Sequence, residues 1–296
     1  VRPISAWIEL PSHKSLKGAN EVSQAIARSA ANKPNLEFLR ITTEEGVEMD
    51  AWMLKPQNFD STKKYPIVFY VYTEPAGQTV QDKFGAGYNF LYKGNMAADG
   101  YIYVSIDSRG TPVPKGRAWR KALYKNIGIL NIRDQAMAAQ ALFRMKPYID
   151  TSRVAVWGWS GGGSTTLNLL FQYPEIYKTG IAVAAVVNQR TYDNIYQERY
   201  SGVPQMDERP YIEGSPLTHA KNLKGNLLYI HGTGDDNVHY NNAEMLINEL
   251  IKHNKQFQLM SYPNRSHSIS EGQGTWEHLS TLYTNYLKQH CPPGAR

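Results

Sequence analysis

A serine in a glycine-rich turn is the first candidate for chemistry in this sequence. Residues 158–162 are Gly-Trp-Ser-Gly-Gly, which fits the Gly-x-Ser-x-Gly pattern around a nucleophilic serine, here Ser160. An apolar run over 153–157 precedes the turn, and a helical pattern over 164–171 follows it. Between a strand and a helix such a serine takes strained backbone angles and stands clear of the sheet. The alternative is a glycine-rich loop with an incidental serine, so the prediction depends on partner residues.

The partners must be a base that takes the hydroxyl proton and an acid that holds the base in one tautomer. In the α/β-hydrolase fold they follow the serine in the order acid, then histidine, each on a loop after a strand. Asp235 and Asp236 follow a predicted strand over 226–230, and His267 follows a predicted strand over 257–261. His267 is therefore the predicted base, and by position either aspartate fits the role of the acid.

An oxyanion hole needs two hydrogen-bond donors aimed at the carbonyl oxygen of the substrate. The backbone N–H of Gly161, the residue after the nucleophile, is one candidate. No His-Gly-Gly-Gly segment follows the predicted strand over 67–72, so the second donor would be a side chain. Tyr72 at the end of that strand can offer its phenol hydroxyl, although a packed core tyrosine is the alternative interpretation.

The elements that must position these residues alternate between strands and helices. This order predicts an α/β-hydrolase fold, with a mostly parallel central sheet and helices on both faces. Two alternating segments, 36–42 and 47–54, predict an antiparallel hairpin at the edge of the sheet. Further strands are predicted over 67–72, 101–106, 153–157, 180–186, 226–230 and 257–261, and helices over 131–145, 164–171, 241–252 and 275–289.

The domain organisation follows from the same pattern. Residues 1–35 have no strong strand signal and are predicted to be an N-terminal extension with a short helix over 20–31. Residues 36–296 are predicted to form the catalytic domain.

Composition excludes several classes of protein. The 296 residues are 42% hydrophobic and 20% charged, with a net charge of +6, which is typical of a globular protein. The basic cluster over 115–121 lacks the basic helix or aromatic platform of a nucleic-acid site, so no nucleic-acid partner is expected. No apolar run is long enough to span a membrane. Cys291 is the only cysteine, so no internal disulfide is expected, and the compartment stays undecided, with periplasm or secretion as the candidates for a full-length protein.

Three segments resemble the dipeptidyl-peptidase members of the prolyl oligopeptidase family of serine peptidases. They are Trp-Gly-Trp-Ser at 157–160, Tyr-Asp-Asn-Ile-Tyr-Gln-Glu-Arg-Tyr at 192–200 and His-Gly-Thr-Gly-Asp-Asp-Asn-Val-His at 231–239. The resemblance extends from about residue 36 to 290. It implies that Ser160 is the nucleophile, Asp235 the acid and His267 the base.

The resemblance also implies the residues that bind the substrate. It places the phenol of Tyr72 and the amide of Gly161 in the oxyanion hole. Asn237 matches a contact to a backbone carbonyl of the substrate. A small apolar pocket for proline is implied at Tyr192, Tyr196, Val186 and Val238.

Three departures from the family pattern concern specificity. Gly161 stands where the family's dipeptidyl peptidases have a tyrosine, and Gln189 stands where an aromatic residue helps to line the pocket. The family also carries an upstream β-propeller, which supplies two glutamates that hold the amino group of the substrate. Nothing in this chain could build a propeller. We therefore expect either the catalytic domain of a longer protein, which the Val1 start favours, or a stand-alone hydrolase.

The predicted function is that of a serine hydrolase that cleaves peptides after a penultimate proline or alanine, without metal or cofactor. The partner is a peptide substrate, and the resemblance also implies a homodimer. A carboxylesterase acting on small esters is the alternative within the same chemistry. An inactive binding or scaffold protein is the alternative from another class, against which the intact Ser160, Asp235 and His267 argue.

Overall fold

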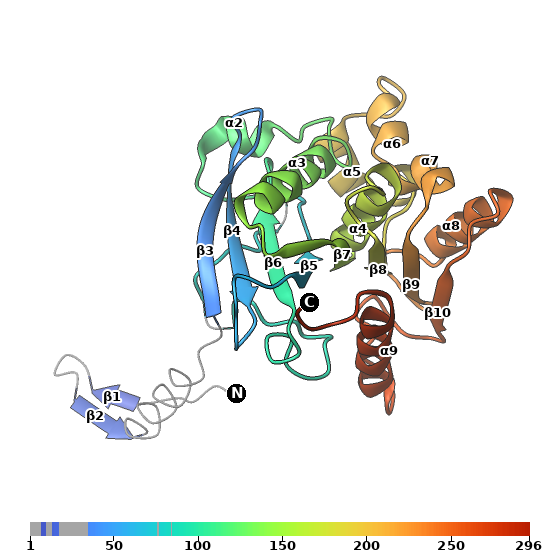
Figure 1. Ribbon diagram of the computed structural model, residues 1–296. Helices are drawn as coiled ribbons and strands as arrows, with labels where there is room; N and C mark the ends of the chain where they lie inside the picture. Colours follow the sequence, from blue (N-terminus) through green and yellow to red (C-terminus); the bar gives the residue numbers. More distant parts are fainter. Residues whose placement is uncertain (1–6, 10–13, 18–34, 76, 84) are drawn as a thin grey trace.

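A computed structural model describes residues 7–9, 14–17, 35–75, 77–83 and 85–296 (Figure 1). Its centre is an eight-stranded sheet with the strand order β10-β9-β8-β7-β5-β6-β4-β3. Every neighbouring pair from β10 to β6 is parallel, whereas β4 pairs antiparallel with both β6 and β3. The strands are β3 (Asn35–Thr42), β4 (Glu48–Lys55), β5 (Tyr65–Tyr70), β6 (Ile102–Asp107), β7 (Ile149–Trp159), β8 (Thr179–Val183), β9 (Asn226–Gly232) and β10 (Gln258–Tyr262).

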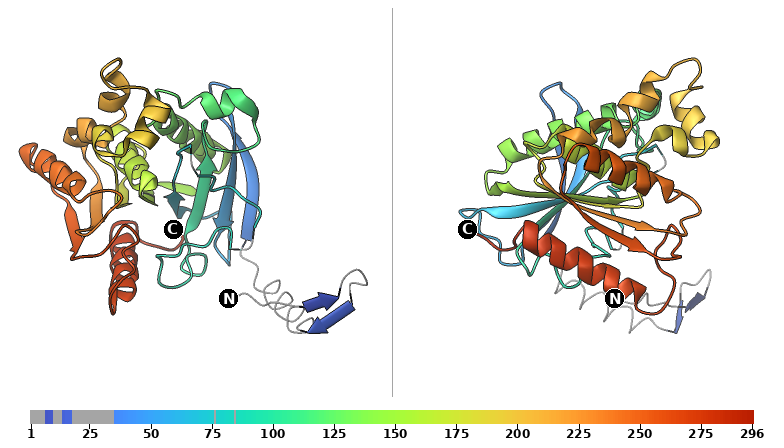
Figure 2. Two further views of the ribbon diagram at one scale, coloured as in Figure 1. Left: turned by 180° about the vertical axis from the view of Figure 1, so that it is seen from behind. Right: turned by 90° about the vertical axis from the view of Figure 1, so that its right-hand side faces the viewer.

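Helices cover both faces of the sheet, as Figure 1 and Figure 2 show. On one face lie α3 (Leu130–Met145), α4 (Gly161–Gln172) and α8 (Asn241–Lys252). The long C-terminal helix α9 (Thr275–His290) covers the other face. The remaining helices are α2 (Gly116–Lys121), α5 (Asn194–Ser201), α6 (Arg209–Glu213) and α7 (Pro216–His219), with short 3-10 turns η1 (Gln189–Thr191) and η2 (Ala220–Asn222).

Two hydrophobic cores fix the sheet between these layers. Val154 and Val156 of β7 point into the core under α3, α4 and α8, while Ala155 and Trp157 point into the core under α9. This alternation follows from the two-residue period of a strand. A strand that is apolar at every position is therefore buried on both faces, which is what the continuous apolar runs predict. The predicted mostly parallel sheet with helices on both faces is confirmed.

Several element boundaries differ from the prediction. The apolar run 67–72 is longer than the strand itself. The strand β5 ends at Tyr70, and Val71 beyond it is still fully buried. Tyr72 thus lies two residues beyond the strand rather than at its end. The run 180–186 likewise continues past the end of β8 at Val183, so that Val186 lies in the loop. These residues follow the carboxyl ends of strands, where the site is formed.

The N-terminal residues contain one feature that the sequence does not predict. Two short strands, β1 (Trp7–Glu9) and β2 (Lys14–Lys17), pair antiparallel where no strand signal is seen. The helix predicted over 20–31 lies outside the described residues. In the part of the chain that the structure describes, no helix is long and apolar enough to cross a membrane.

Candidate active site

Ser160 occupies the sharp turn between β7 and α4. Its backbone angles, φ 59° and ψ −121°, are strained for a residue with a side chain, and its N–H donates to the carbonyl of Val183 at 2.8 Å. Two glycines make the turn possible. A Cβ on Gly158 would lie 2.4 Å from the carbonyl oxygen of Gly162, and a Cβ on Gly162 would lie 2.3 Å from that of Val71. Only glycine therefore lets α4 begin directly after the serine.

Asp235 lies in the loop after β9 and is only 4% exposed. Its Oδ1 accepts hydrogen bonds from the backbone N–H groups of Asn237 at 3.0 Å and Val238 at 2.8 Å. Its Oδ2 lies 2.8 Å from Nδ1 of His267 and 3.2 Å from Nε2 of His231. Burial acts to raise the pKa of Asp235, but the hydrogen bonds from His231 and His267 outweigh it and hold the pKa below its usual range. The carboxylate is therefore ionised at neutral pH.

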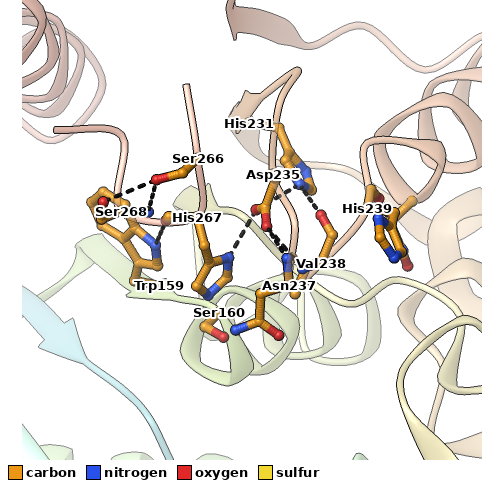
Figure 3. Close-up of polar contacts among 12 residues, drawn as sticks. Trp159, Ser160, His231, Asp235, Asn237, Val238, His239, Ser266, His267 and Ser268 are labelled. Atoms are coloured by element: carbon orange, nitrogen blue, oxygen red, sulfur yellow. Dashed lines mark hydrogen bonds and ion pairs between the residues drawn. The ribbon is translucent and has the colours of Figure 1, made fainter. Parts of the chain in front are cut away.

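His267 lies in the loop after β10, and its imidazole stands between Asp235 and Ser160 (Figure 3). The indole Nε1 of Trp159 donates to the backbone carbonyl of His267 at 2.9 Å. This bond ties the histidine loop to the residue before the serine. The structure therefore brings the three predicted residues Ser160, Asp235 and His267 together, each from a loop after a different strand.

The neighbouring acid and histidines are placed differently. Asp236 is exposed, whereas Asp235 faces the imidazole of His267. His231 is fully buried and its Nε2 lies 2.7 Å from the carbonyl oxygen of Val238, so it braces the Asp235 loop. His239 is exposed and lies on the far side of that loop from His267 (Figure 3).

One predicted oxyanion donor, Gly161, directly follows the serine in the chain. The other, Tyr72, lies in the loop after β5, the strand that neighbours β7 in the sheet. Gly161 is the first residue of α4, so its N–H has no partner within the helix. The Tyr72 hydroxyl has no hydrogen-bond partner among the described residues. Burial and the nearby Glu74 carboxylate raise the pKa of Tyr72 to about 12, so the phenol keeps its proton. The hydroxyl is therefore free to donate to a substrate.

The loop that carries Tyr72 is held by buried polar contacts. Thr73 has a left-handed φ of 46°, and its Oγ1 lies 2.8 Å from Oγ1 of Thr165 on α4. The side-chain amide of Asn131 on α3 donates to Thr73 Oγ1 at 3.0 Å. These bonds fix the backbone at Thr73, and because Thr73 lies between Tyr72 and Glu74 they also position the side chains of these two neighbours.

Three of the predicted substrate-binding residues are joined to one another. The rings of Tyr192 and Tyr196 meet edge to face, with centroids 5.6 Å apart. The Tyr192 hydroxyl donates to Oδ1 of Asn237 at 2.8 Å. Val186 and Val238 are buried, and the backbone carbonyl of Val186 accepts a hydrogen bond from Ser164 on α4. Tyr192, Tyr196 and Asn237 therefore form one connected group beside the loop of Asp235.

Glu74 is a site residue that the sequence analysis missed. The hydroxyl of Tyr196 donates to its Oε2 at 2.5 Å. A Cβ on Gly161 would lie 2.4 Å from the Glu74 carboxyl carbon, so this carboxyl fills the space where a side chain at 161 would begin. Burial raises the pKa of Glu74 to about 7, against the opposing effect of the Tyr196 hydrogen bond. An acid two residues after Tyr72 was the available signal.

Gln189 has a buried side chain that is engaged in hydrogen bonds. It accepts from the side-chain amide of Gln197 at 2.5 Å and donates to the carbonyl of Gly214 at 3.4 Å. This residue therefore joins η1 to α5 and to the end of α6. Among the described residues, no group of three or more His, Cys, Asp or Glu side chains is arranged to hold a metal ion.

Comparison with known proteins decides the family. The model of the prolyl oligopeptidase family matches residues 90–292. The chain belongs to the prolyl oligopeptidase family. A probable dipeptidyl-aminopeptidase B of Trichophyton verrucosum is 40% identical over 240 residues, which are 80% of this chain and 26% of that protein. Prolyl endopeptidase FAP of Mus musculus is 35% identical over 241 residues, which are 80% of this chain and 31% of that protein.

Solved structures of this family agree with the sequence matches. Dipeptidyl peptidase 4 of Porphyromonas gingivalis matches 97% of this chain with a TM-score of 0.84 and 33% identity, over 42% of its own length. A putative dipeptidyl aminopeptidase IV of Bacteroides ovatus matches 87% with a TM-score of 0.81 and 32% identity, over 36% of its length. The α/β-hydrolase fold is thus confirmed, and within the prolyl oligopeptidase family the chain is similar to dipeptidyl peptidases. It spans about a quarter of the length of the first curated relative.

Proposed function

We propose that this chain holds the catalytic site of a peptidase that releases dipeptides from the N-terminus of peptides by way of an acyl-enzyme. One observation carries the proposal. The imidazole of His267 lies between the Asp235 carboxylate, 2.8 Å from its Nδ1, and a serine in the strained turn between β7 and α4. The similarity to dipeptidyl aminopeptidases gives the class of substrate.

In the proposed mechanism Asp235 accepts the Nδ1–H of His267, which leaves Nε2 free to face Ser160. Nε2 takes the hydroxyl proton as Ser160 attacks the carbonyl carbon of the scissile bond. The resulting oxyanion receives hydrogen bonds from the Tyr72 phenol and the Gly161 amide. His267 then gives its proton to the leaving amine, and the acyl-enzyme remains. Water activated by the same imidazole completes the reaction and regenerates Ser160.

The residue before the scissile bond is assigned to the pocket beside Tyr192 and Tyr196. A proline ring gains by burial against the two phenol rings, and its missing N–H leaves no donor unsatisfied. Val186 and Val238 are assigned to the apolar wall and Asn237 to the substrate backbone. We assign alanine as the second accepted residue, because Gln189 stands where the family pattern has an aromatic residue that helps to line the pocket.

The relatives are about two to three times longer than this chain. We propose that in the complete protein an additional β-propeller would hold the amino group of the substrate. The catalytic residues proposed above all belong to the present chain, so acyl transfer itself can be measured on it.

The test compares two chromogenic substrates, Gly-Pro p-nitroanilide and p-nitrophenyl acetate. We expect turnover of the anilide by the intact chain and loss of that turnover in Ser160→Ala and His267→Gln. The anilide has an amine leaving group that needs protonation by His267, whereas p-nitrophenolate leaves without it. Turnover of the ester without any turnover of the anilide would instead identify this chain as a carboxylesterase.

A further inference from the structure

A cavity of about 620 Å³ opens beside the proposed active site, and the mechanism does not use it. The walls include Pro75, Pro112, Leu123, Tyr124 and Tyr200, which give apolar surface. Four cationic side chains and Gly110 complete the lining, and no acidic side chain belongs to it. The cations are Arg117, Arg120 and Lys121 of α2 and Arg199 of α5.

These four cations differ from the basic residues around them. Arg109 pairs with Asp134, Lys115 with Asp50 and Lys125 with Asp207. In the described residues no acidic side chain forms an ion pair with any of the four cations of the cavity. Like charges around one cleft repel each other and concentrate a positive potential inside it. The cavity therefore favours an anion.

The walls of the cavity are held together by the fold. The N–H of Lys125 donates to the carbonyl of Tyr200 at 2.7 Å, which joins the segment after α2 to α5. The N–H of Gly110 donates to the carbonyl of Trp119 at 2.9 Å, which joins the segment after β6 to α2. Both helices lie at the same end of the molecule in Figure 1. The cations thus come from two helices in a fixed relation.

The cavity lies next to the proposed substrate pocket. The ring of Tyr200 is 4.9 Å from that of Tyr196, whose hydroxyl binds Glu74 beside Gly161. Pro75, which follows Glu74 in the chain, lines the cavity directly. Tyr196 and Glu74 thus connect the cavity to the residue after Ser160 through three contacts. We take this as roughly the reach of three or four extended peptide residues, at ~3.3–3.6 Å each.

We propose that this cavity binds a carboxylate of a peptide held at Ser160, so that the enzyme prefers peptides with an aspartate or glutamate within about four residues of the scissile bond. The guanidinium groups of Arg117, Arg120 and Arg199 suit a carboxylate because their paired N–H donors match its two oxygens. The apolar wall suits the rest of the peptide. This inference rests on the proposed function, since it places the ligand on the substrate of Ser160.

The experiment uses acid and amide pairs of peptides that differ only in charge. One arm compares Asp-Pro and Asn-Pro anilides, with the acid on the acyl side. The other arm compares Gly-Pro peptides that carry Asp or Asn at each of the first four positions after the scissile bond. In one arm we expect kcat/KM for the acid to exceed that for the amide roughly tenfold at low salt, the order expected for one charge-assisted hydrogen bond. The arm that shows this preference identifies whether the carboxylate lies before or after the scissile bond.

Variants assign the preference to the cavity. We expect Arg117→Gln and Arg120→Gln to reduce the acid-to-amide ratio to about one, while the control Lys224→Gln, an exposed lysine outside the cavity, leaves it unchanged. High salt should reduce the ratio in the unmodified chain, which requires no variant to fold. A ratio near one in both arms, or a ratio that survives both substitutions, overturns the proposal.

A binding measurement separates this proposal from the proposed function. Calorimetric titration of the same peptides onto Ser160→Ala needs no turnover. Tighter binding of the acid than of the amide, lost in Arg117→Gln, supports the cavity even if no peptide is cleaved. Equal binding of both overturns the cavity, whatever the peptidase activity.

Discussion

Glu74 gives the sharpest prediction about the energetics of the site. Burial raises its pKa to about 7 from an ordinary value of 4.5, so the folded state holds its proton where the unfolded state has lost it. Stability therefore falls as pH rises from the unfolded pKa to the folded one, and stays lower above it. A shift of this size corresponds to at most about 3 kcal/mol, at 1.36 kcal/mol for each pKa unit. Glu74→Gln removes this cost and keeps an acceptor for the Tyr196 hydroxyl.

The assay is urea unfolding of both proteins between pH 5 and 8.5. The free energy of unfolding of Glu74→Gln minus that of the unmodified chain should rise with pH, by up to about 3 kcal/mol, and level off above pH 8. Asp236→Asn is the matched control, because Asp236 is exposed, and its difference should stay flat. A difference for Glu74→Gln that is constant, or that falls with pH, would refute a partly buried carboxyl with a raised pKa beside Gly161.

Three further predictions concern the catalytic machinery. Asp235→Asn should lower kcat by roughly 10⁴, whereas Asp236→Asn should lower it only slightly. Two backbone N–H groups hold Oδ1 of residue 235, so the new amide must face the Nδ1–H of His267. Equal losses in a steady-state assay would reject this assignment. Tyr72→Phe should lower kcat by roughly 10²–10³, the cost of one oxyanion donor, and a near-normal rate would place that donor elsewhere. Gly161→Ala should destabilise the chain by about 0.5–1.5 kcal/mol, because the new Cβ displaces the end of the Glu74 side chain and breaks its hydrogen bond with Tyr196; thermal unfolding would show this loss, which should be absent in a Glu74→Gly background.

Most of the fold could be predicted because its strands and long helices have strong hydrophobic patterns. The helix α8 begins and ends at the predicted residues, and the edge hairpin of β3 and β4 is confirmed. The helices α2, α5, α6 and α7 have four to eight residues each. Helices this short have little stability of their own and depend on tertiary contacts such as the Lys125–Tyr200 hydrogen bond. Sequence patterns therefore missed them.

The site could be predicted where its residues follow the carboxyl ends of strands. Ser160, Asp235 and His267 each follow a recognisable strand within about five residues, so chain order selected the serine and the histidine and left two aspartates as candidates for the acid. The choice of Asp235 over Asp236 needed the family resemblance. Glu74 was missed because its environment depends on Tyr196, 122 residues further along the chain. The cationic cavity was missed for the same reason, since α2 and α5 meet only in the folded protein.

The central claim, that Ser160 is a nucleophile activated by His267, is tested most directly by chemical labelling. A fluorophosphonate reacts with a serine only where a neighbouring base removes its proton, and its fluoride leaves as the phosphorus–oxygen bond forms. Peptide mapping by mass spectrometry should find the adduct on Ser160, at a rate that falls sharply in His267→Gln. An unlabelled Ser160, or an adduct that forms equally fast without His267, would contradict the account.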